Sequence, residues 1–486
     1  MYEKYLDFAI FANMKRIRII LAALCFLCLT LLFVGIGQNW WGWLAKLQFL
    51  PAVTRIIGGA TLGNIAAVAV ILLVTWLFGR IYCSVLCPLG VFQDIVIWLR
   101  RTLGKIIKPL RKKYNYSKER RWVRYPVLAL YIACLIVDVQ LLTAILGPYS
   151  AYGRMVTAVV GGGPAPFLIA AGVTFAVIVL CSWIWGRAWC NTVCPVGTFL
   201  GCFSKFSLFR IRIDEDKCVK CGACEHICKA SCIDSPNRTI DNSRCVDCFN
   251  CVDFCKVGAI RFGLATRKLP QETPASDTSE AVNGRRAFIA TGAALIGAGL
   301  TAKAQEMKLD GGLAHIEAKT PIEREPRLVP PGAQSVKNFY DKCTACQLCI
   351  TACKNGVLRP STDLDHFLQP QMGYENGFCR PECTACSEIC PTGAIVSLQK
   401  DAKTLIHIGV ASVDAELCLA AKGEEHCGKC ARECPMGAIS MVEVDGHNRP
   451  VVAEEICIGC GKCEYLCPSR PISAIKVNGI ETHRNG

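Results

Sequence analysis

The chain has 486 residues, 34 of them cysteine, and a formal net charge of +15 at pH 7. This length is too great for one hydrophobic core and predicts two to four domains. The cysteines recur at short, regular spacings along a long chain, which excludes a small disulfide-stapled scaffold. Residues 100–124 hold eleven Lys/Arg and one acidic residue between two apolar stretches. That distribution indicates a cytoplasmic loop of a membrane protein and not a nucleic-acid-binding surface.

Four apolar stretches are long enough to cross a bilayer, which takes about 20 residues. They cover residues 19–36, 56–78, 126–146 and 166–185. Three basic residues precede the first stretch within positions 15–18, and three tryptophans follow it within positions 40–43. This asymmetry predicts a cytoplasmic N-terminus. Two spans then return the chain to the basic segment 100–124, and two more return it to the cytoplasm near residue 186.

One motif, Gly-Arg-x-x-Cys-x-x-x-Cys-Pro-x-Gly, occurs twice, each time at the end of an apolar stretch. The copies begin at Gly79 and Gly186, and every shared residue is displaced by 107 positions. This constant offset predicts a duplicated two-helix unit. If the helix continues through each motif, its two thiols lie on one helix face. The predicted topology brings both cysteine pairs to the cytoplasmic side, namely Cys83 and Cys87 with Cys190 and Cys194.

Two cysteine motifs with the C-x2-C-x2-C-x3-C spacing of bacterial ferredoxins follow the fourth span. Their members are Cys218, Cys221, Cys224 and Cys228, then Cys245, Cys248, Cys251 and Cys255. In paired modules the fourth cysteine of one motif binds the cluster of the other. We therefore expect Cys255 to complete the first cluster and Cys228 to complete the second, in a cytoplasmic module.

A twin-arginine pattern separates this module from the rest of the chain. A polar linker leads to Arg285, Arg286 and Phe288, then to a weakly apolar run that ends before Ala302-Lys-Ala304. This arrangement is typical of a twin-arginine export signal, although an Arg-Arg pair can precede an apolar helix by chance. The segment is expected either to be cleaved after Ala304 or to persist as a fifth helix. Either outcome places the following domain outside the cytoplasmic membrane.

The exported part carries four more ferredoxin-type motifs. Their members are Cys343, Cys346, Cys349 and Cys353; Cys379, Cys383, Cys386 and Cys390; Cys418, Cys427, Cys430 and Cys434; and Cys457, Cys460, Cys463 and Cys467. Adjacent and nested pairing are both open, but the strand-like link at residues 439–446 favours adjacent pairing. Cys467 would then join the third motif and Cys434 the fourth, and the same logic pairs the first two. All six motifs together predict six 4Fe-4S clusters, with iron held by these 24 cysteines.

These patterns predict an α-helical membrane domain of four spans, with the twin-arginine segment as a possible fifth, and α+β bacterial ferredoxin-type 4Fe-4S modules on both sides of the membrane. The expected boundaries are 1–205 for the membrane domain and 206–265 for the cytoplasmic two-cluster module. A linker (266–283), the signal or fifth helix (284–304) and a tether (305–340) follow. Residues 341–486 form the periplasmic four-cluster domain.

The membrane part offers few redox ligands. No C-x-x-C-H motif occurs and all seven histidines lie outside the predicted spans, so we expect no haem. Cys83, Cys87, Cys190 and Cys194 are then the best candidates for an additional metal, a cluster or a redox dithiol. The structural alternative is that Cys-Pro ends a helix and small thiols allow close packing.

Asp138 is the only acidic residue inside a predicted span and is a candidate proton acceptor for quinol oxidation, with a hydrogen-bonded structural role as the alternative. Tyr149, Tyr152 and Arg154, between the third and fourth spans, are candidates for contact with a quinol head group.

The repeated motifs and the Cys218–Cys255 module resemble the membrane polyferredoxin family that includes NapH and the membrane part of NosR. From the twin arginines onward the chain resembles the exported four-cluster ferredoxins of the NapG/MauM type. Together the two resemblances cover nearly the whole chain and imply a fusion. They further imply a quinol dehydrogenase-type component of the bacterial inner membrane, which takes electrons from the quinone pool to a periplasmic reductase or electron-carrier protein.

Two other functions stay open at this point. Electrons can run from a soluble cytoplasmic redox protein that docks near Cys218–Cys255, attracted by the basic segment 100–124. Alternatively, the chain can serve as a maturation or regulatory reductant for a metal centre in a partner enzyme. No nucleic-acid partner is expected.

Overall fold

The structure is a computed structural model that describes residues 2–58, 62–107, 114–136, 140–161, 164–264, 318–363, 365–423, 426–444 and 446–485. The described residues of Met1–Ala265 and Thr320–Gly486 form one compact unit. Asp138 and the twin-arginine segment, including Arg285 and Arg286, lie outside the described residues. The expectations for these residues therefore stay predictions.

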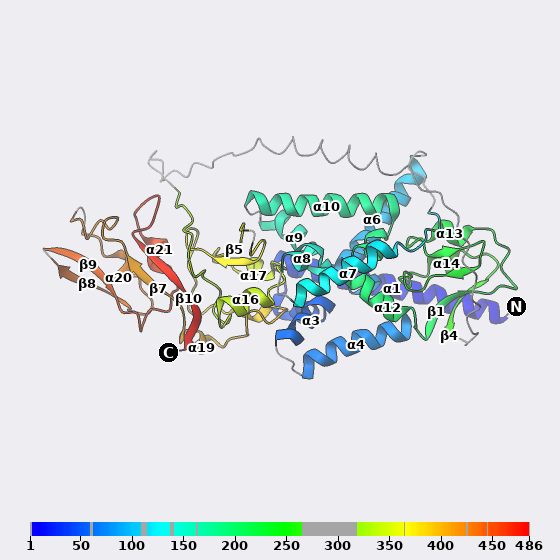
Figure 1. The fold of residues 1–486 in the computed structure, drawn as a ribbon, viewed down its shortest axis with the longest axis horizontal. Helices are drawn as coiled ribbons and strands as arrows, with labels where there is room; N and C mark the ends of the chain where they lie inside the picture. Colours follow the sequence, from blue (N-terminus) through cyan, green and yellow to red (C-terminus); the bar gives the residue numbers. More distant parts are fainter. Residues whose placement is uncertain are drawn as a thin grey trace. The chain divides into compact units, whose positions relative to one another are not determined.

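Helices make up the described part of the first 205 residues (Figure 1). They are α1 (Tyr2–Val34), α2 (Gln38–Lys46), α3 (Phe49–Gly58), α4 (Leu62–Phe78), α5 (Ile81–Val85), α6 (Pro88–Ile106), α7 (Arg121–Ile136), α8 (Gln140–Leu146), α9 (Pro148–Gly161), α10 (Ala165–Trp185), α11 (Ala188–Thr192) and α12 (Pro195–Ser204). Helix α10 packs against α6 and α9, while α1 packs against α2, α5, α6 and α9.

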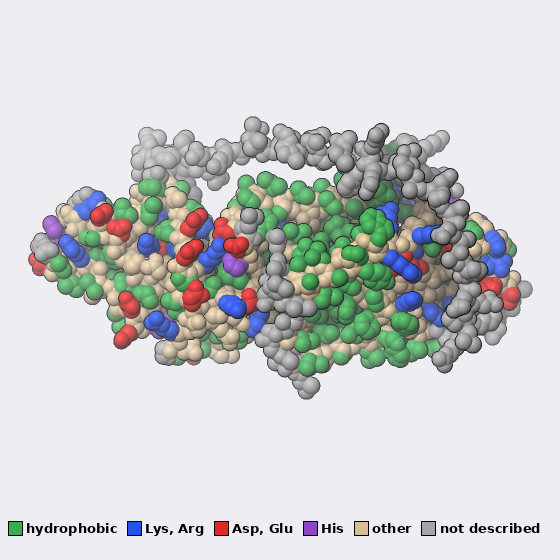
Figure 2. Space-filling view, in the orientation of Figure 1, with side chains coloured by type: hydrophobic (Ala, Val, Ile, Leu, Met, Phe, Trp, Pro, Cys, Tyr) green, Lys and Arg blue, Asp and Glu red, His purple; other side chains and the backbone are tan. Residues whose placement is uncertain are grey.

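Two helices in the described part of the chain are long and apolar enough to cross a membrane. They are Met14–Val34 of α1 and Ala165–Trp185, each of 21 residues. Large apolar side chains such as Ile20, Leu24 and Ile169 are exposed on them, and Figure 2 shows hydrophobic side chains gathered over the helical part of the molecule. An exposed apolar surface of this size marks a face that contacts lipid or another protein. The second predicted span is carried by α3 and α4 and the third by α7 and α8, all of them shorter helices.

The first two ferredoxin motifs lie in a small α+β module. It contains β1 (Phe209–Ile213), α13 (Ala223–Ile227), β2 (Ile233–Asp234), β3 (Thr239–Ile240), α14 (Asn250–Phe254) and β4 (Ile260–Leu264). Strands β1 and β4 pair antiparallel, with Ile213 opposite Ile260, and β2 pairs with β3. Each short helix begins inside a cysteine motif and ends at the residue before its fourth cysteine.

The C-terminal domain is also α+β. Its elements are α16 (Val336–Lys342), α17 (Leu348–Ala352), β5 (Leu358–Pro360), β6 (Pro370–Met372), α18 (Ala385–Ile389), α19 (Lys400–Lys403), β7 (Ile406–Val413), α20 (Lys429–Arg432), β8 (Ile439–Val444), β9 (His447–Val452), α21 (Lys462–Leu466) and β10 (Ile475–Asn485). Strand β7 pairs antiparallel with β10, β8 with β9, and β5 with β6. The strand-like link expected after the third outer motif is β8.

The two ferredoxin regions lie near opposite ends of the apolar part of α1, Met14–Val34. Lys15, near the start of its apolar part, forms a 2.6 Å ion pair with Asp253 of α14. Phe33, one residue before its end, packs on Tyr149 of α9 with ring centroids 5.2 Å apart. The next residue, Ser150, donates a 2.6 Å hydrogen bond to the carbonyl of Thr344 in the C-terminal domain. At 1.5 Å per residue, Lys15 and Phe33 are separated by about 27 Å along the helix.

Gly153 sits where the helices meet the C-terminal domain. A Cβ at this position would lie 2.4 Å from Phe33 Cε1 and 2.6 Å from the carbonyl oxygen of Cys346. We predict that Gly153→Ala destabilises the detergent-solubilised protein by about 1–3 kcal/mol, because backbone must move to admit the methyl group. The matched control is Gly172→Ala on α10, where nothing lies within 4 Å of the new Cβ. Thermal unfolding followed by circular dichroism tests this, and equal midpoints for the two variants would contradict it.

Candidate iron–sulfur sites

The α+β module between β1 and β4 is called the inner module below. In it, thiols of the first two motifs lie close to one another. Burial, together with the nearby thiols of Cys248, Cys245 and Cys228, raises the pKa of Cys251 well above its ordinary value. Cys224 of the first motif contributes to the same shift, so thiols of both motifs, including Cys228, lie near Cys251. Thiols so placed repel one another as thiolates unless a metal supplies positive charge, which is the chemistry of an iron–sulfur ligand set.

The first two outer motifs exchange their fourth cysteines. Burial and the neighbouring thiols of Cys343, Cys346 and Cys390 raise the pKa of Cys349. Burial also raises the pKa of Cys386, and the nearby thiols of Cys379, Cys353 and Cys383 add to this shift. Cys390 therefore lies with the first motif and Cys353 with the second.

The last two outer motifs are arranged as adjacent partners. A small cavity of about 30 Å³ is lined by Cys418, Cys427, Cys430 and Cys467, so the final cysteine of the fourth motif lies with the third. In the fourth motif, burial raises the pKa of Cys460 to about 11, and Cys434 and Cys457 add to the shift. Of the two pairings left open by the sequence, the structure has the adjacent one.

Lys403 is a buried cation beside the second outer motif. Its ammonium donates to Cys379 Sγ at 3.3 Å and to the carbonyl oxygens of Arg380 and Cys383 at 2.6 and 2.5 Å. The side chain lies at the end of α19, twenty residues beyond Cys383, so no motif in the sequence pointed to it. Positive charge and hydrogen bonds at a cluster sulfur stabilise the reduced, more negative state.

The repeated motifs bring four more thiols together. Cys83 lies in α5 and Cys190 in α11, whereas Cys87 and Cys194 are the N-cap residues of α6 and α12, each followed by proline. The helix therefore stops between the two cysteines of each pair, since a residue before proline disfavours the helical conformation. All four side chains are buried, with exposures of 4–5%.

The two motif arginines cross between the repeats. Arg80 Nη2 donates to the carbonyl of Cys190 at 3.1 Å and contacts Cys83 Sγ at 3.8 Å. Arg187 Nη1 donates to the carbonyl of Cys83 at 2.9 Å and contacts Cys190 Sγ at 3.9 Å. Both guanidinium groups are fully buried. Each repeat thus supplies the cation that lies between its own first thiol and the backbone of the other.

The motif glycines permit this crossing. A Cβ on Gly90 would lie 2.2 Å from the carbonyl oxygen of Cys83 and 2.9 Å from Arg187 Nη1. A Cβ on Gly197 would lie 2.1 Å from the carbonyl oxygen of Cys190 and 2.7 Å from Arg80 Nη2. Any larger residue at either position would clash with the backbone of its own repeat and with the arginine of the other repeat.

The charge around the four thiols favours an anionic group. Burial, followed by nearby thiols, raises the pKa of Cys87 and of Cys194 above the ordinary cysteine value. Two buried guanidinium groups and the N-termini of α6 and α12 oppose that effect by stabilising negative charge. Within the described residues, no three His, Cys, Asp or Glu side chains stand close enough to hold a single metal ion.

A buried core joins three of these thiols to both ferredoxin regions. Cys83, Cys87 and Cys194 share one hydrophobic cluster with Cys248 of the inner module and Cys346 of the C-terminal domain. Tyr149 and Tyr82 belong to the same core.

Asp94 is a site residue that the motifs did not reveal. Its carboxylate accepts from Arg187 Nε at 2.8 Å and from Lys229 Nζ at 2.5 Å. Burial alone would raise the pKa of Asp94, but these two cations hold it well below its usual range. Lys229 follows Cys228, so this ion pair links the repeated motif to the inner module. The sequence distinguishes Asp94 only by a difference between the two repeats, because the second repeat has Gly201 at the matching position.

The candidates in the loop after the third span are packing residues. Tyr149, Tyr152 and Arg154 lie in α9, which begins at Pro148, and are buried in the helical core. Tyr152 shares a 2.7 Å hydrogen bond with Thr30, and Arg154 donates to the carbonyl of Ala144 at 2.7 Å. The segment expected to be a loop is therefore a helix, and the contact of these side chains with a quinol head group stays a prediction.

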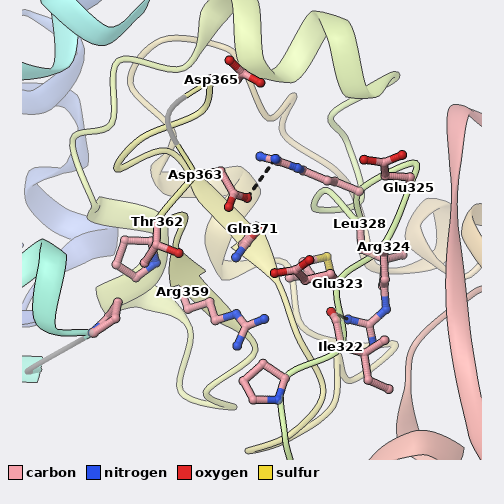
Figure 3. A pocket seen from close by; sticks show the side chains of 15 residues that line it. Ile322, Glu323, Arg324, Glu325, Leu328, Arg359, Thr362, Asp363, Asp365 and Gln371 are labelled. Atoms are coloured by element: carbon pink, nitrogen blue, oxygen red, sulfur yellow. Dashed lines mark hydrogen bonds and ion pairs between the residues drawn. The ribbon is translucent and has the colours of Figure 1, made fainter.

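A cavity of about 830 Å³ lies at the C-terminal domain (Figure 3). Its arginines already have carboxylate partners. Arg327 pairs with Asp363 at 2.8 Å and Arg359 with Glu375 at 2.5 Å. No cysteine lines this cavity, so we assign no redox role to it.

Comparison with known proteins identifies ferredoxin-type domains in the chain. A family described as 4Fe-4S binding domain matches residues 61–106 and 167–214, which contain the two repeated motifs. A 4Fe-4S dicluster domain matches residues 425–470, and a further 4Fe-4S binding domain matches 215–231 and 340–356. The chain therefore contains iron–sulfur cluster binding domains in the helical region, the inner module and the C-terminal region.

Several curated proteins are similar to the chain over part of its length. An uncharacterised protein of Methanocaldococcus jannaschii is 27% identical over 36% of the chain and 61% of its own length. The ferredoxin-type protein NapH of Haemophilus influenzae is 30% identical over 39% and 58%. The methylamine utilization ferredoxin-type protein MauN of Methylobacillus flagellatus is 26% identical over 39% and 63%. The chain thus spans about three-fifths of these relatives, and no solved structure matches it.

We predict that Lys403→Gln lowers the reduction potential of the cluster bound at Cys379 by about 60 mV or more, the equivalent of about 1.4 kcal/mol for one electron. The variant loses the ammonium charge beside Cys379 Sγ. Lys400→Gln is the matched control, because Lys400 is exposed on the same short helix. An EPR-monitored redox titration measures both variants, and coincident potentials would refute the role of Lys403.

Proposed function

We propose that the chain is an iron–sulfur electron-transfer protein of the bacterial cytoplasmic membrane, which takes electrons from quinol and delivers them to a periplasmic reductase or electron carrier. The observation that carries this proposal is the buried four-thiol site, three of whose cysteines (Cys83, Cys87 and Cys194) share one hydrophobic core with Cys248 and Cys346. The ferredoxin-type names of the NapH and MauN relatives support the class of function.

The 24 motif cysteines form the ligand sets of six 4Fe-4S clusters in this proposal. We assign a further cluster to Cys83, Cys87, Cys190 and Cys194, supported by the 4Fe-4S family match over both repeats. Such clusters supply one-electron redox chemistry. The protein contributes the buried guanidinium groups of Arg80 and Arg187, which offset the negative charge of four thiolates and of the added electron.

The electron balance follows from quinol chemistry. Oxidation of one quinol to quinone releases two electrons and two protons. Clusters held by the motif cysteines would take up these electrons one at a time, and the protons pass to water. The periplasmic partner is then reduced by the same two electrons.

The contacts near the two ends of the apolar part of α1 support a placement of ferredoxin modules on both faces of the membrane. The roughly 27 Å between Lys15 and Phe33 is close to the bilayer's hydrocarbon thickness of about 30 Å. Residues 206–265 would then be cytoplasmic and residues 341–486 periplasmic. The four spans and the twin-arginine signal complete this proposed topology.

One observation favours a second entry point for electrons. Cys221 of the first motif is exposed at the surface of the inner module. A cluster held there is accessible to a soluble cytoplasmic donor, so reduction from the cytoplasm is the alternative direction of flow.

Anaerobic mixing of the solubilised chain with a menaquinol analogue, followed by EPR, separates these directions. We expect reduced-cluster signals at a catalytically useful rate. Clusters that stay oxidised with quinol but respond to dithionite would refute direct quinol oxidation and favour the cytoplasmic donor.

Replacement of the repeat cysteines tests the four-thiol site. We predict that Cys83→Ser and Cys190→Ser each lose about four iron atoms per chain and slow quinol-driven reduction of the outer clusters. Cys134→Ser on α7 is the control, since that cysteine belongs to none of the proposed ligand sets. Iron content and cluster EPR give the result. Unchanged iron together with unchanged quinol oxidation would remove the proposed cluster.

A further inference from the structure

A second cavity, of about 620 Å³, lies between α1 and α6. Its walls are mainly apolar and include Ala22, Ala23 and Phe26 of α1 with Val91 and Ile97 of α6. Side chains at its rim, such as Ile19 and Trp98, are exposed on the apolar surface of the helices. The cavity therefore opens toward the region that lipid would cover in the proposed topology.

Charged groups gather among the residues that line the same cavity. Asp94 accepts from Lys229 at 2.5 Å and lies 3.7 Å from Arg18 Nη1. Arg18 Nε is buried and has no hydrogen-bond partner among the described residues. A buried N–H without an acceptor is costly, and a ligand oxygen would satisfy it.

The cavity also adjoins the inner ferredoxin module. Lys229 lines it and directly follows Cys228, while Asn250 lines it and directly precedes Cys251. Both cysteines belong to the same proposed ligand set. A molecule in the cavity would thus touch residues adjacent in sequence to two cluster ligands.

We propose that this cavity binds the head group of an isoprenoid quinone, with a carbonyl oxygen accepting from Arg18 and the tail leaving between α1 and α6. This inference rests on the proposed quinol oxidation and names its site. An amphiphile with a small polar ring and a long apolar tail fits an apolar cavity with a few polar groups. The neighbouring cluster ligands favour a redox-active occupant over a structural phospholipid.

The test uses a photoreactive azidoquinone on the full-length, cluster-loaded protein in proteoliposomes. We expect label on peptides from α1 or α6, with competition by a menaquinone analogue and none by phosphatidylglycerol. Label confined to other helices, or displaced by the phospholipid as well as by the quinone, overturns the site.

A matched pair of variants makes the test specific. Ala23→Trp fills the cavity from an exposed position on α1 and touches no proposed cluster ligand. Ala69→Trp places the same ring on an exposed position of α4, which does not line the cavity. We expect Ala23→Trp to reduce labelling and to raise the KM for quinol at least tenfold, while Ala69→Trp and the iron content stay as in the wild type. Equal labelling and equal KM in the two variants would overturn the inference.

The two readouts separate this inference from the proposed function. Labelling at α1 or α6 without quinol-driven cluster reduction contradicts quinol oxidation and leaves the binding site standing. Rapid cluster reduction that Ala23→Trp does not affect contradicts the site and leaves quinol oxidation standing.

Discussion

Two buried arginines, each reaching across to the other repeat, are the interaction on which the helical part depends. Arg80 binds the backbone beside Cys190, and Arg187 binds the backbone beside Cys83. A fully buried guanidinium is expensive unless its donors are used, so the two repeats are stable only together. The same groups set the charge of the thiol site and, through Asp94 and Lys229, hold the inner ferredoxin module against the helices. Packing, charge and redox environment therefore depend on one set of contacts.

Sequence reasoning recovered the parts of this arrangement that repeat or follow fixed spacings. The offset of 107 positions predicted two equivalent units whose cysteine pairs meet, and in the structure Arg80 contacts Cys83 while Arg187 contacts Cys190. Ferredoxin spacing predicted α+β modules, because thiols at such intervals must surround a common centre. The exchange of fourth cysteines between adjacent motifs also follows the known habit of paired modules.

Other features of the structure were not predicted, either because they depend on tertiary contacts or because they follow from proline positions that the predictions did not use. Pro148 begins α9, so the segment expected to be a loop is a helix in which Tyr149 and Tyr152 are buried. Proline is favoured at the first position of a helix, so Pro148 was a sequence signal for the start of this helix. Pro88 and Pro195 likewise end the helix before them, which separates the two thiols of each pair. Asp94 and Lys403 had no such signal, since each acquires its role from a partner that is distant in sequence. The cavity between α1 and α6 has no counterpart in any motif.

The exchange of fourth cysteines has a consequence for how such chains change over evolutionary time. No single motif of the C-terminal domain encloses a centre with its own four thiols, because Cys353 and Cys390, like Cys434 and Cys467, lie with the neighbouring motif. Duplication or deletion of one motif would therefore leave two incomplete ligand sets, whereas duplication or deletion of a pair would leave none. Chains of clusters built this way are expected to gain or lose two clusters at a time. A single additional cluster, such as the one proposed between the membrane repeats, must come from a different structural source.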